Sequence, residues 1–229
     1  AAFRVSGSSE NADVVPTFDA SSVTASSSLM GFIGKGEGGY DSANRGTNSK
    51  GDIVGSQRVA SRGGKKVSEM TIAEIQKHQS IKNPYSKNRL FAVGKYQAIP
   101  STFNSAVKAL NLSPDTVFTP EVQEQVGLYL VSEKRPLVGK YLRGEGDVST
   151  NKAMLNLAME FASIPVPFPI AKGAYGKWPK TDLVAGDSFY KSPKAKRGNR
   201  ASHSIKGTRA ILESARGSLS RSSKKEEEE

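Results

Sequence analysis

The sequence predicts a mainly α-helical domain with a small, irregular β-hairpin lobe near its N-terminal end. Several segments between residues 71 and 161 begin with helix-capping residues and continue with apolar residues at helical spacing. Residues 38–67 are instead rich in Gly, Ser, Asn and Arg, and their one short apolar piece, Ile53-Val54, stands between glycines. The 229 residues suffice for one domain of about 150 residues and two tails.

The helix starts can be read in chain order. Thr71 and Glu74 form a capping box, in which each side chain bonds the backbone N–H of the other, and predict a helix to about residue 79. Pro100 and Thr119-Pro120 predict two further starts, because proline suits the first turn of a helix. Shorter helices are expected over residues 137–142 and after Ser149 or Thr150.

Composition divides the chain into three parts. Residues 1–27 are Ser-rich and predict a flexible arm, residues 28–190 carry the domain pattern, and residues 191–229 form a basic segment that we expect to be disordered. Within that segment, residues 205–219 are expected to form a basic helix on binding a partner. No apolar run is long enough to span a membrane, and the absence of cysteine excludes disulfides and thiolate metal sites.

The formal net charge of +11 favours an anionic polymer or surface as partner. Between residues 194 and 225, ten Lys or Arg and one Glu give a net charge of +9. This segment would suit anionic wall polymer, an outer-membrane surface, nucleic acid or other virion proteins, and a solvated linker explains it equally well. We expect a monomer outside any virion assembly.

Four short segments carry the functional signal. They are Gly36-Glu37-Gly38, Asp52-Ile53-Val54-Gly55, Gly94-Lys95-Tyr96-Gln97 and Phe161-Ala162-Ser163-Ile164-Pro165. Each is weak alone: a Glu or Asp between glycines is most often a solvated turn residue, and a Tyr before a helix is often packing. Their common order along the chain is more specific than any one of them.

In that order the segments resemble the lysozyme superfamily, and within it the lambda-type endolysins that act as lytic transglycosylases. The resemblance runs from about residue 29 to residue 165, and on to residue 178 in weaker form. It implies a lysozyme-like α+β fold and a peptidoglycan-degrading enzyme that cleaves the glycosidic bond between MurNAc and GlcNAc. The sequence departs from the family where Val166-Pro167-Phe168-Pro169 precede the later Gly173–Gly176 turn, so this wall of the cleft is expected to differ.

The resemblance implies catalytic roles for Glu37 and Asp52. Glu37 would be the general acid, since a helix C-terminus beside apolar residues raises the pKa of a carboxyl group. In a lytic transglycosylase this one carboxyl group then acts as base toward the hydroxymethyl group of the sugar, and no water is consumed. Asp52 would be an orienting or electrostatic residue, and a structural turn role stays open for it.

The resemblance also implies a set of substrate-binding residues. Tyr96 and Gln97 would lie on the cleft floor and Ser163 on the opposite wall, although core packing is an equal alternative for Tyr96 and Ser163. Tyr175 would stack on a sugar face, or else anchor its loop. His78 and His203 have no partner at ligand spacing, so we assign neither to metal binding or catalysis and expect no metal or other cofactor.

Three alternatives remain open. A hydrolytic muramidase of the same fold would use water in the second step. A non-catalytic glycan- or partner-binding virion protein would keep the fold without cutting, and a basic nucleic-acid-binding protein would use the segment after residue 191. The enzyme interpretation predicts a bacteriophage lysin, either part of the virion or reaching the cell wall from the host cytoplasm or periplasm.

Overall fold

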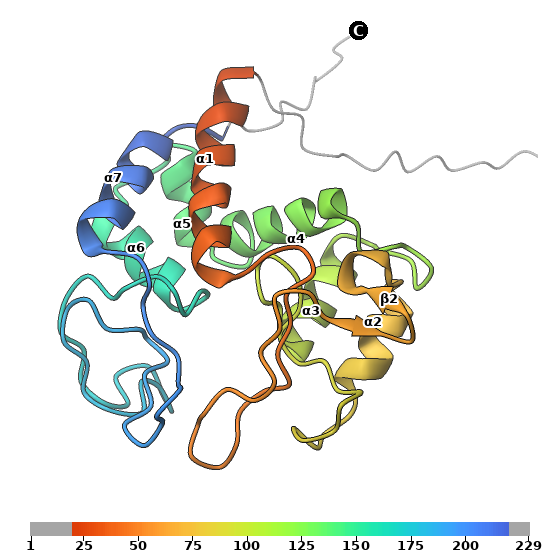
Figure 1. Ribbon diagram of the computed structural model, residues 1–229. Helices are drawn as coiled ribbons and strands as arrows, with labels where there is room; N and C mark the ends of the chain where they lie inside the picture. The colour runs from red at the N-terminus through yellow and green to blue at the C-terminus, as the bar shows by residue number, and fades with distance from the viewer. Residues whose placement is uncertain (1–19, 220–229) are drawn as a thin grey trace, which may run out of the picture.

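The computed structural model describes residues 20–219, which form a mainly helical domain with one two-stranded antiparallel sheet. The elements, in chain order, are α1 (Ala20–Glu37), β1 (Ser61–Arg62), β2 (Lys65–Lys66), a 3-10 helix η1 (Val67–Glu69), α2 (Ile72–Gln79), α3 (Pro100–Ala109), α4 (Pro120–Ser132), α5 (Pro136–Leu142), α6 (Thr150–Ala158) and α7 (Ile205–Ala215). Figure 1 shows α5, α6 and α7 on one side and α2, α3 and the strands on the other, with α4 between them.

Helix α1 links the two sides. Its residues Leu29, Met30 and Ile33 are buried, and it contacts both α4 and α7. The helix ends at Glu37, where glycines follow and the N–H of Gly38 still donates to the carbonyl of Gly34 (2.9 Å). Residues 20–27 of the expected flexible arm are part of this helix, and the rest of the arm lies outside the described residues.

The predicted helix starts at residues 71–150 are confirmed. The Thr71 capping box forms in both directions, with the Thr71 N–H donating to Glu74 (2.8 Å) and the Glu74 N–H donating to Thr71 (3.2 Å). Thr119 and Ser149 accept from backbone N–H groups at the starts of α4 and α6, and proline occupies the first turn of α3 and α4. Local side-chain hydrogen bonds fix these boundaries, so tertiary contacts are not needed to place them.

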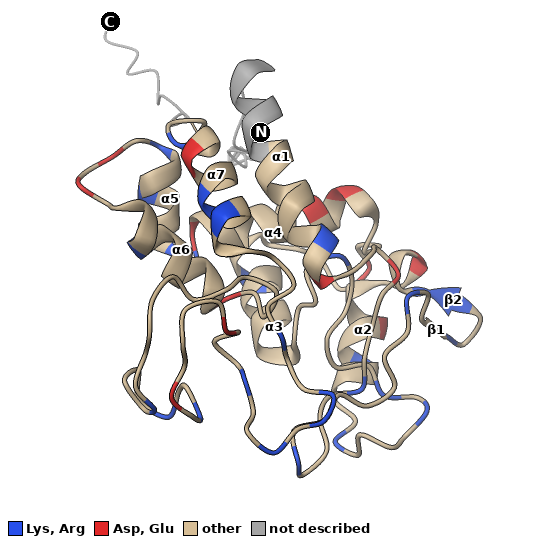
Figure 2. Cartoon of the chain, turned by 60° about the vertical axis from the view of Figure 1, so that its left-hand side comes forward, with Lys and Arg blue, Asp and Glu red and all other residues tan. Residues whose placement is uncertain are grey.

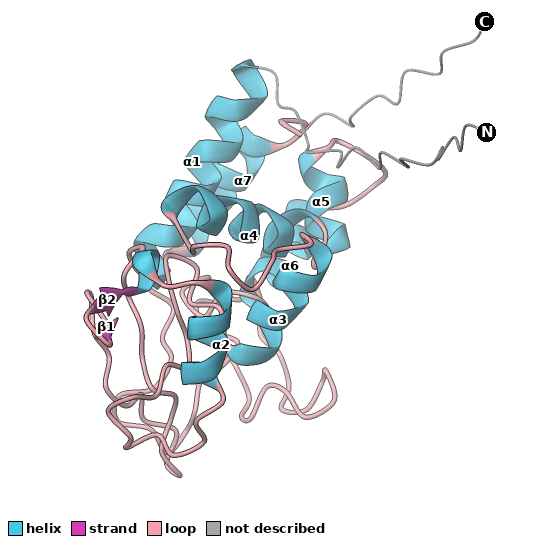
Figure 3. Cartoon of the chain, turned by 90° about the vertical axis from the view of Figure 1, so that its right-hand side faces the viewer, coloured by secondary structure: helices cyan, strands magenta, loops and turns pink. Residues whose placement is uncertain are grey.

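The irregular hairpin lobe is also confirmed in its coarse form. Residues 43–57 fold back on themselves through isolated bridges that pair Ala43 with Gln57 and Thr47 with Ile53, and β1 and β2 pair just after them. A further bridge joins Ala43 to Val93, so the lobe is tied to the segment that leads into α3. Most of this lobe is loop (Figure 3), because its glycines and polar residues support only short ladders.

Much of the segment after residue 190, which we expected to be disordered, is folded. Helix α7 packs against α1 and α6, and its residues Thr208, Leu212 and Ala215 are buried. Figure 2 shows basic residues in blue on α7; of these, Lys206 is exposed, and the half-buried Arg209 donates from Nη2 to Asn151 Oδ1 of α6 at 2.9 Å. Burial of the apolar face therefore stabilises the packing of α7 on the domain, and the positive charge of the helix does not prevent it. Residues 220–229 lie outside the described part.

Within residues 20–219, no helix combines the length and the apolar character that crossing a membrane would require.

Candidate active site

Glu37 lies at the C-terminus of α1 against the segment that carries Ser163. The backbone N–H of Ser163 donates to Glu37 Oε1 at 2.8 Å. Burial raises the pKa of the Glu37 carboxyl above its usual range, and this outweighs the hydroxyl and N–H of Ser163, which lower it. The direction predicted from the apolar neighbours is confirmed. A raised pKa is the direction that general acid chemistry needs in a carboxyl group.

The glycines on either side of Glu37 allow two walls to approach it closely. A Cβ on Gly36 would lie 2.6 Å from Ser163 Cβ, and a Cβ on Gly38 would lie 3.3 Å from Gln97 Nε2. The two neighbours of Glu37 in the chain therefore pack closely, Gly36 against Ser163 and Gly38 near Gln97. Larger residues at positions 36 and 38 would push the walls apart.

Gln97 is held rigidly beside the hairpin lobe. Its Nε2 donates to the carbonyls of Gly94 (2.9 Å) and Ser42 (3.3 Å), and its Oε1 accepts from Asn44 Nδ2 (3.3 Å). Its φ of 46° is in the left-handed region, which non-glycine residues seldom occupy and which is more common at functional sites. The structure thus brings Gln97 to Glu37, while its role toward a substrate stays a prediction.

A second carboxylate adds to the electrostatics of Glu37. Glu160 has only 4% of its side chain exposed and pairs with Lys134 Nζ (2.5 Å) and Arg135 Nε (2.8 Å). Its negative charge contributes, after burial, to the raised pKa of Glu37. Burial raises the pKa of Tyr190, and the negative charges of Glu160 and Glu37 raise it further. The pairing with two cations keeps Glu160 in place without neutralising its effect on Glu37.

Tyr96 is buried, which agrees with the packing alternative for this residue. Only 4% of the residue is exposed, and its hydroxyl donates to Glu124 Oε2 at 2.5 Å. Lys95 and Tyr40 bind the other oxygen of Glu124, whose side chain is 38% exposed, so the residues form one polar cluster that reaches the surface. Burial and the Glu124 carboxylate both raise the pKa of Tyr96. Its role is the packing alternative, because a buried phenol needs a partner and Glu124 supplies one.

Asp52 is engaged by a different part of the chain. Its Oδ1 accepts from the Arg197 N–H at 2.7 Å and its Oδ2 from Asn48 Nδ2 at 3.3 Å. These hydrogen bonds, the one from Arg197 first, hold the pKa of Asp52 below its usual range. Asp52 therefore anchors the 195–198 loop to the hairpin lobe. This arrangement matches the structural turn role, and a catalytic role for Asp52 stays a prediction.

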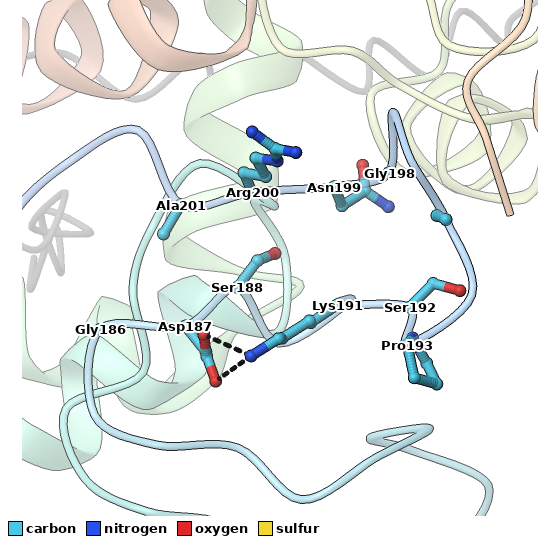
Figure 4. Close-up of a pocket in the computed structure, with 11 residues that line it drawn as sticks. Gly186, Asp187, Ser188, Lys191, Ser192, Pro193, Gly198, Asn199, Arg200 and Ala201 are labelled. Carbon is cyan, nitrogen blue, oxygen red and sulfur yellow. Dashed lines mark hydrogen bonds and ion pairs between the residues drawn. The ribbon is translucent and has the colours of Figure 1, made fainter.

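Tyr175 lies in the loops that follow Ser163 in the chain. Tyr175 is 46% exposed, and its ring packs edge-to-face on Phe189 at 5.9 Å. A cavity of about 460 Å³ opens nearby between residues 186–193 and 195–201. Figure 4 shows Asp187 paired with Lys191 on one side of it and Asn199 and Arg200 on the other. Because Ser202 donates to the Ser163 carbonyl (3.0 Å), this cavity borders the segment that holds Glu37.

The sequence-based reasoning missed His203. The His203 ring stacks on Phe32 with centroids 3.9 Å apart, and the backbone N–H of His203 donates to the carbonyl of Ser163 at 3.2 Å. The missed signal is Ser204, which caps a helix whose residues 205, 208, 212 and 215 follow helical spacing. That pattern predicts a packed α7, and a packed α7 places the residue before its cap against α1.

Across residues 20–219, no three His, Asp or Glu side chains gather as a metal site would require. Comparison with protein-family models, curated proteins and solved structures finds no match for this chain.

Proposed function

We propose that this protein is a peptidoglycan lytic transglycosylase with Glu37 as the general acid and base. The observation that carries the proposal is the Glu37 carboxyl, whose pKa is raised by burial at the end of α1 and whose Oε1 is held by the Ser163 N–H. The close packing of Gly36 against Ser163 and of Gly38 near Gln97 supports it, because those segments take part in the resemblance to lambda-type endolysins.

The chemistry follows from the arrangement of the carboxyl group. With Oε1 held by Ser163, the other oxygen is left to carry the proton that protonates the glycosidic oxygen as the bond to the leaving GlcNAc breaks. The resulting carboxylate then accepts the proton of the C6 hydroxyl of the MurNAc residue as that oxygen attacks C1. The product is a 1,6-anhydro end, and the proton of Glu37 is restored.

A single-carboxylate reaction is favoured over the hydrolytic muramidase by the surroundings of Asp52. A hydrolase of the two-carboxylate kind needs a second carboxylate across the bond that is cut. Asp52 instead binds the Arg197 N–H, and Glu160 is held by Lys134 and Arg135.

The test is lysis of purified sacculi by the wild type and by Glu37→Gln, followed by mass analysis of the released muropeptides. We expect Glu37→Gln to lower the rate by at least about 100-fold, while Glu213→Gln, a change on the exposed face of α7, leaves it unchanged. Products lighter by one water than hydrolysis products identify the transglycosylase. Full lysis by Glu37→Gln would overturn the proposal, and intact binding without any lysis by the wild type would identify a binding module.

A further inference from the structure

Two buried polar atoms without hydrogen-bond partners lie at Gly36. They are Ser163 Oγ and His203 Nε2, and among the residues that the structure describes neither has a partner. A Cβ on Gly36 would lie 2.7 Å from the first and 2.4 Å from the second, so both atoms border the same point in the chain. Buried polar groups in native proteins are nearly always paired, and an unpaired donor beside an unpaired acceptor calls for a reason.

The tautomer of His203 follows from its contacts. The carbonyl of Phe32 raises the pKa of the ring, as an acceptor near a ring N–H does, and since Nε2 has no partner we assign the hydrogen to Nδ1. In the neutral ring Nε2 is then a lone pair, directed toward the region of Ser163. Burial and Lys35 lower the pKa of His203 and outweigh the Phe32 carbonyl, so the neutral ring persists near pH 7.

Ser163 stands between His203 and Glu37. Its N–H holds Glu37 Oε1, and its carbonyl accepts from the N–H of His203 (3.2 Å), so the backbone already joins the three residues. The Ser163 hydroxyl is near enough to the Glu37 carboxyl to lower the pKa of that group, although it makes no hydrogen bond of normal geometry. Its one hydrogen is available to Glu37 or to His203, but not to both at once.

We infer that His203 is a positioning residue, whose Nε2 lone pair competes with the Glu37 carboxylate for the Ser163 hydroxyl hydrogen. The inference rests on the proposed role of Glu37 as the acid. A carboxylate that loses part of this hydrogen bond binds a proton more tightly, so competition from His203 raises the pKa of Glu37, which is the direction that the first step needs.

Other charged groups face this cluster and are unchanged by the test below. Lys35 on α1 acts on His203. Glu160, after α6, acts on Glu37, and Arg135 and Tyr190 lie in the field of both carboxylates. Since none of them contacts Ser163 Oγ, which has no partner, an effect transmitted through the Ser163 hydroxyl can be separated from theirs by removing that hydroxyl.

The experiment is a carbon NMR titration of the Glu37 carboxyl in the full chain, which needs no substrate. His203→Asn keeps a donor near the place of Nδ1 and removes the acceptor at Nε2, whereas His203→Gln keeps a carbonyl oxygen near the place of Nε2. We expect His203→Asn to lower the pKa of Glu37 by up to about one pH unit and His203→Gln to restore most of the wild-type value. Ser163→Ala should raise the pKa of Glu37, because the hydroxyl lowers it.

The double variant decides the route of the effect. In the Ser163→Ala background, His203→Asn should leave the pKa of Glu37 unchanged. An equal shift in both backgrounds, or no shift in the wild-type background, would overturn the inference. If His203→Asn does not fold, His203→Leu, which also lacks an acceptor at the place of Nε2, is compared in the same two backgrounds. Lysis of sacculi by the wild type is measured separately. The proposed role of His203 can therefore fail while the proposed enzyme activity is confirmed, and the enzyme activity can fail while the role of His203 is confirmed.

Discussion

Replacing Gly36 by Ala should separate the Ser163 segment from Glu37. The new Cβ would lie 2.4 Å from His203 Nε2, 2.6 Å from Ser163 Cβ and 2.7 Å from Ser163 Oγ. Carbon atoms in van der Waals contact lie about 3.5–4.0 Å apart, so the neighbours must move by about 1 Å. Ser163 cannot yield alone, because its backbone is bound to Glu37, Ser202 and His203.

Gly31→Ala is the matched control, because Gly31 is in the same helix and no atom lies within 4 Å of the Cβ it would carry. We expect this change to stabilise the protein by about 0.5–1 kcal/mol, since alanine loses less backbone entropy than glycine in a helix. Overpacking at Gly36 costs about 1–3 kcal/mol, and the difference between the two variants measures that cost.

The assay is urea unfolding of both variants followed by circular dichroism, with sacculus lysis measured on the same preparations. Gly36→Ala should unfold at lower urea than Gly31→Ala and should lose most of its lytic rate, while Gly31→Ala keeps its rate. Equal stabilities, together with equal rates, would refute the close packing of α1 against Ser163 and His203.

Three other variants test separate parts of the structure. Leu212→Ala should lower the free energy of unfolding, measured in urea, by about 2–5 kcal/mol because Leu212 is fully buried in α7. An unchanged free energy of unfolding would mean that residues 205–219 do not pack on the domain. Glu37→Gln should be more stable than the wild type at neutral pH. The pKa of Glu37 is higher in the folded protein than its ordinary value of 4.5. The contribution of Glu37 to the free energy of unfolding is therefore fully present below pH 4.5 and is lost as the pH rises through the folded pKa. Between these two pKa values the loss is about 1.4 kcal/mol per pH unit. Unfolding from pH 4 to pH 8 should show the variant's advantage grow and then level off, and a constant difference would contradict a raised pKa. Tyr96→Phe should cost about 1.5–3 kcal/mol through the lost bond to Glu124 and leave the KM for glycan unchanged, since a raised KM would place Tyr96 in the site after all.

The sequence predictions were accurate where the interactions that fix a feature lie close together in the chain. The starts of α2, α4 and α6 could be predicted because Thr71, Thr119 and Ser149 cap helices within three residues of themselves. The raised pKa of Glu37 was also predictable, since the apolar residues that bury it precede it in the same helix. Tyr96 was not, because its burial depends on Glu124, which is 28 residues away in the chain.

The sequence by itself determined the starts of most helices and the irregular hairpin lobe, because hydrogen bonds and apolar periodicity within single segments set them, and it singled out Glu37 as the candidate acid. Only the tertiary structure decided what surrounds that acid. The N–H that holds Glu37 comes from Ser163, 126 residues later, and His203 reaches the same point only because α7 packs on α1. Contacts of such separation arise from the burial of apolar faces in three dimensions, and no local pattern specifies which residues they bring together.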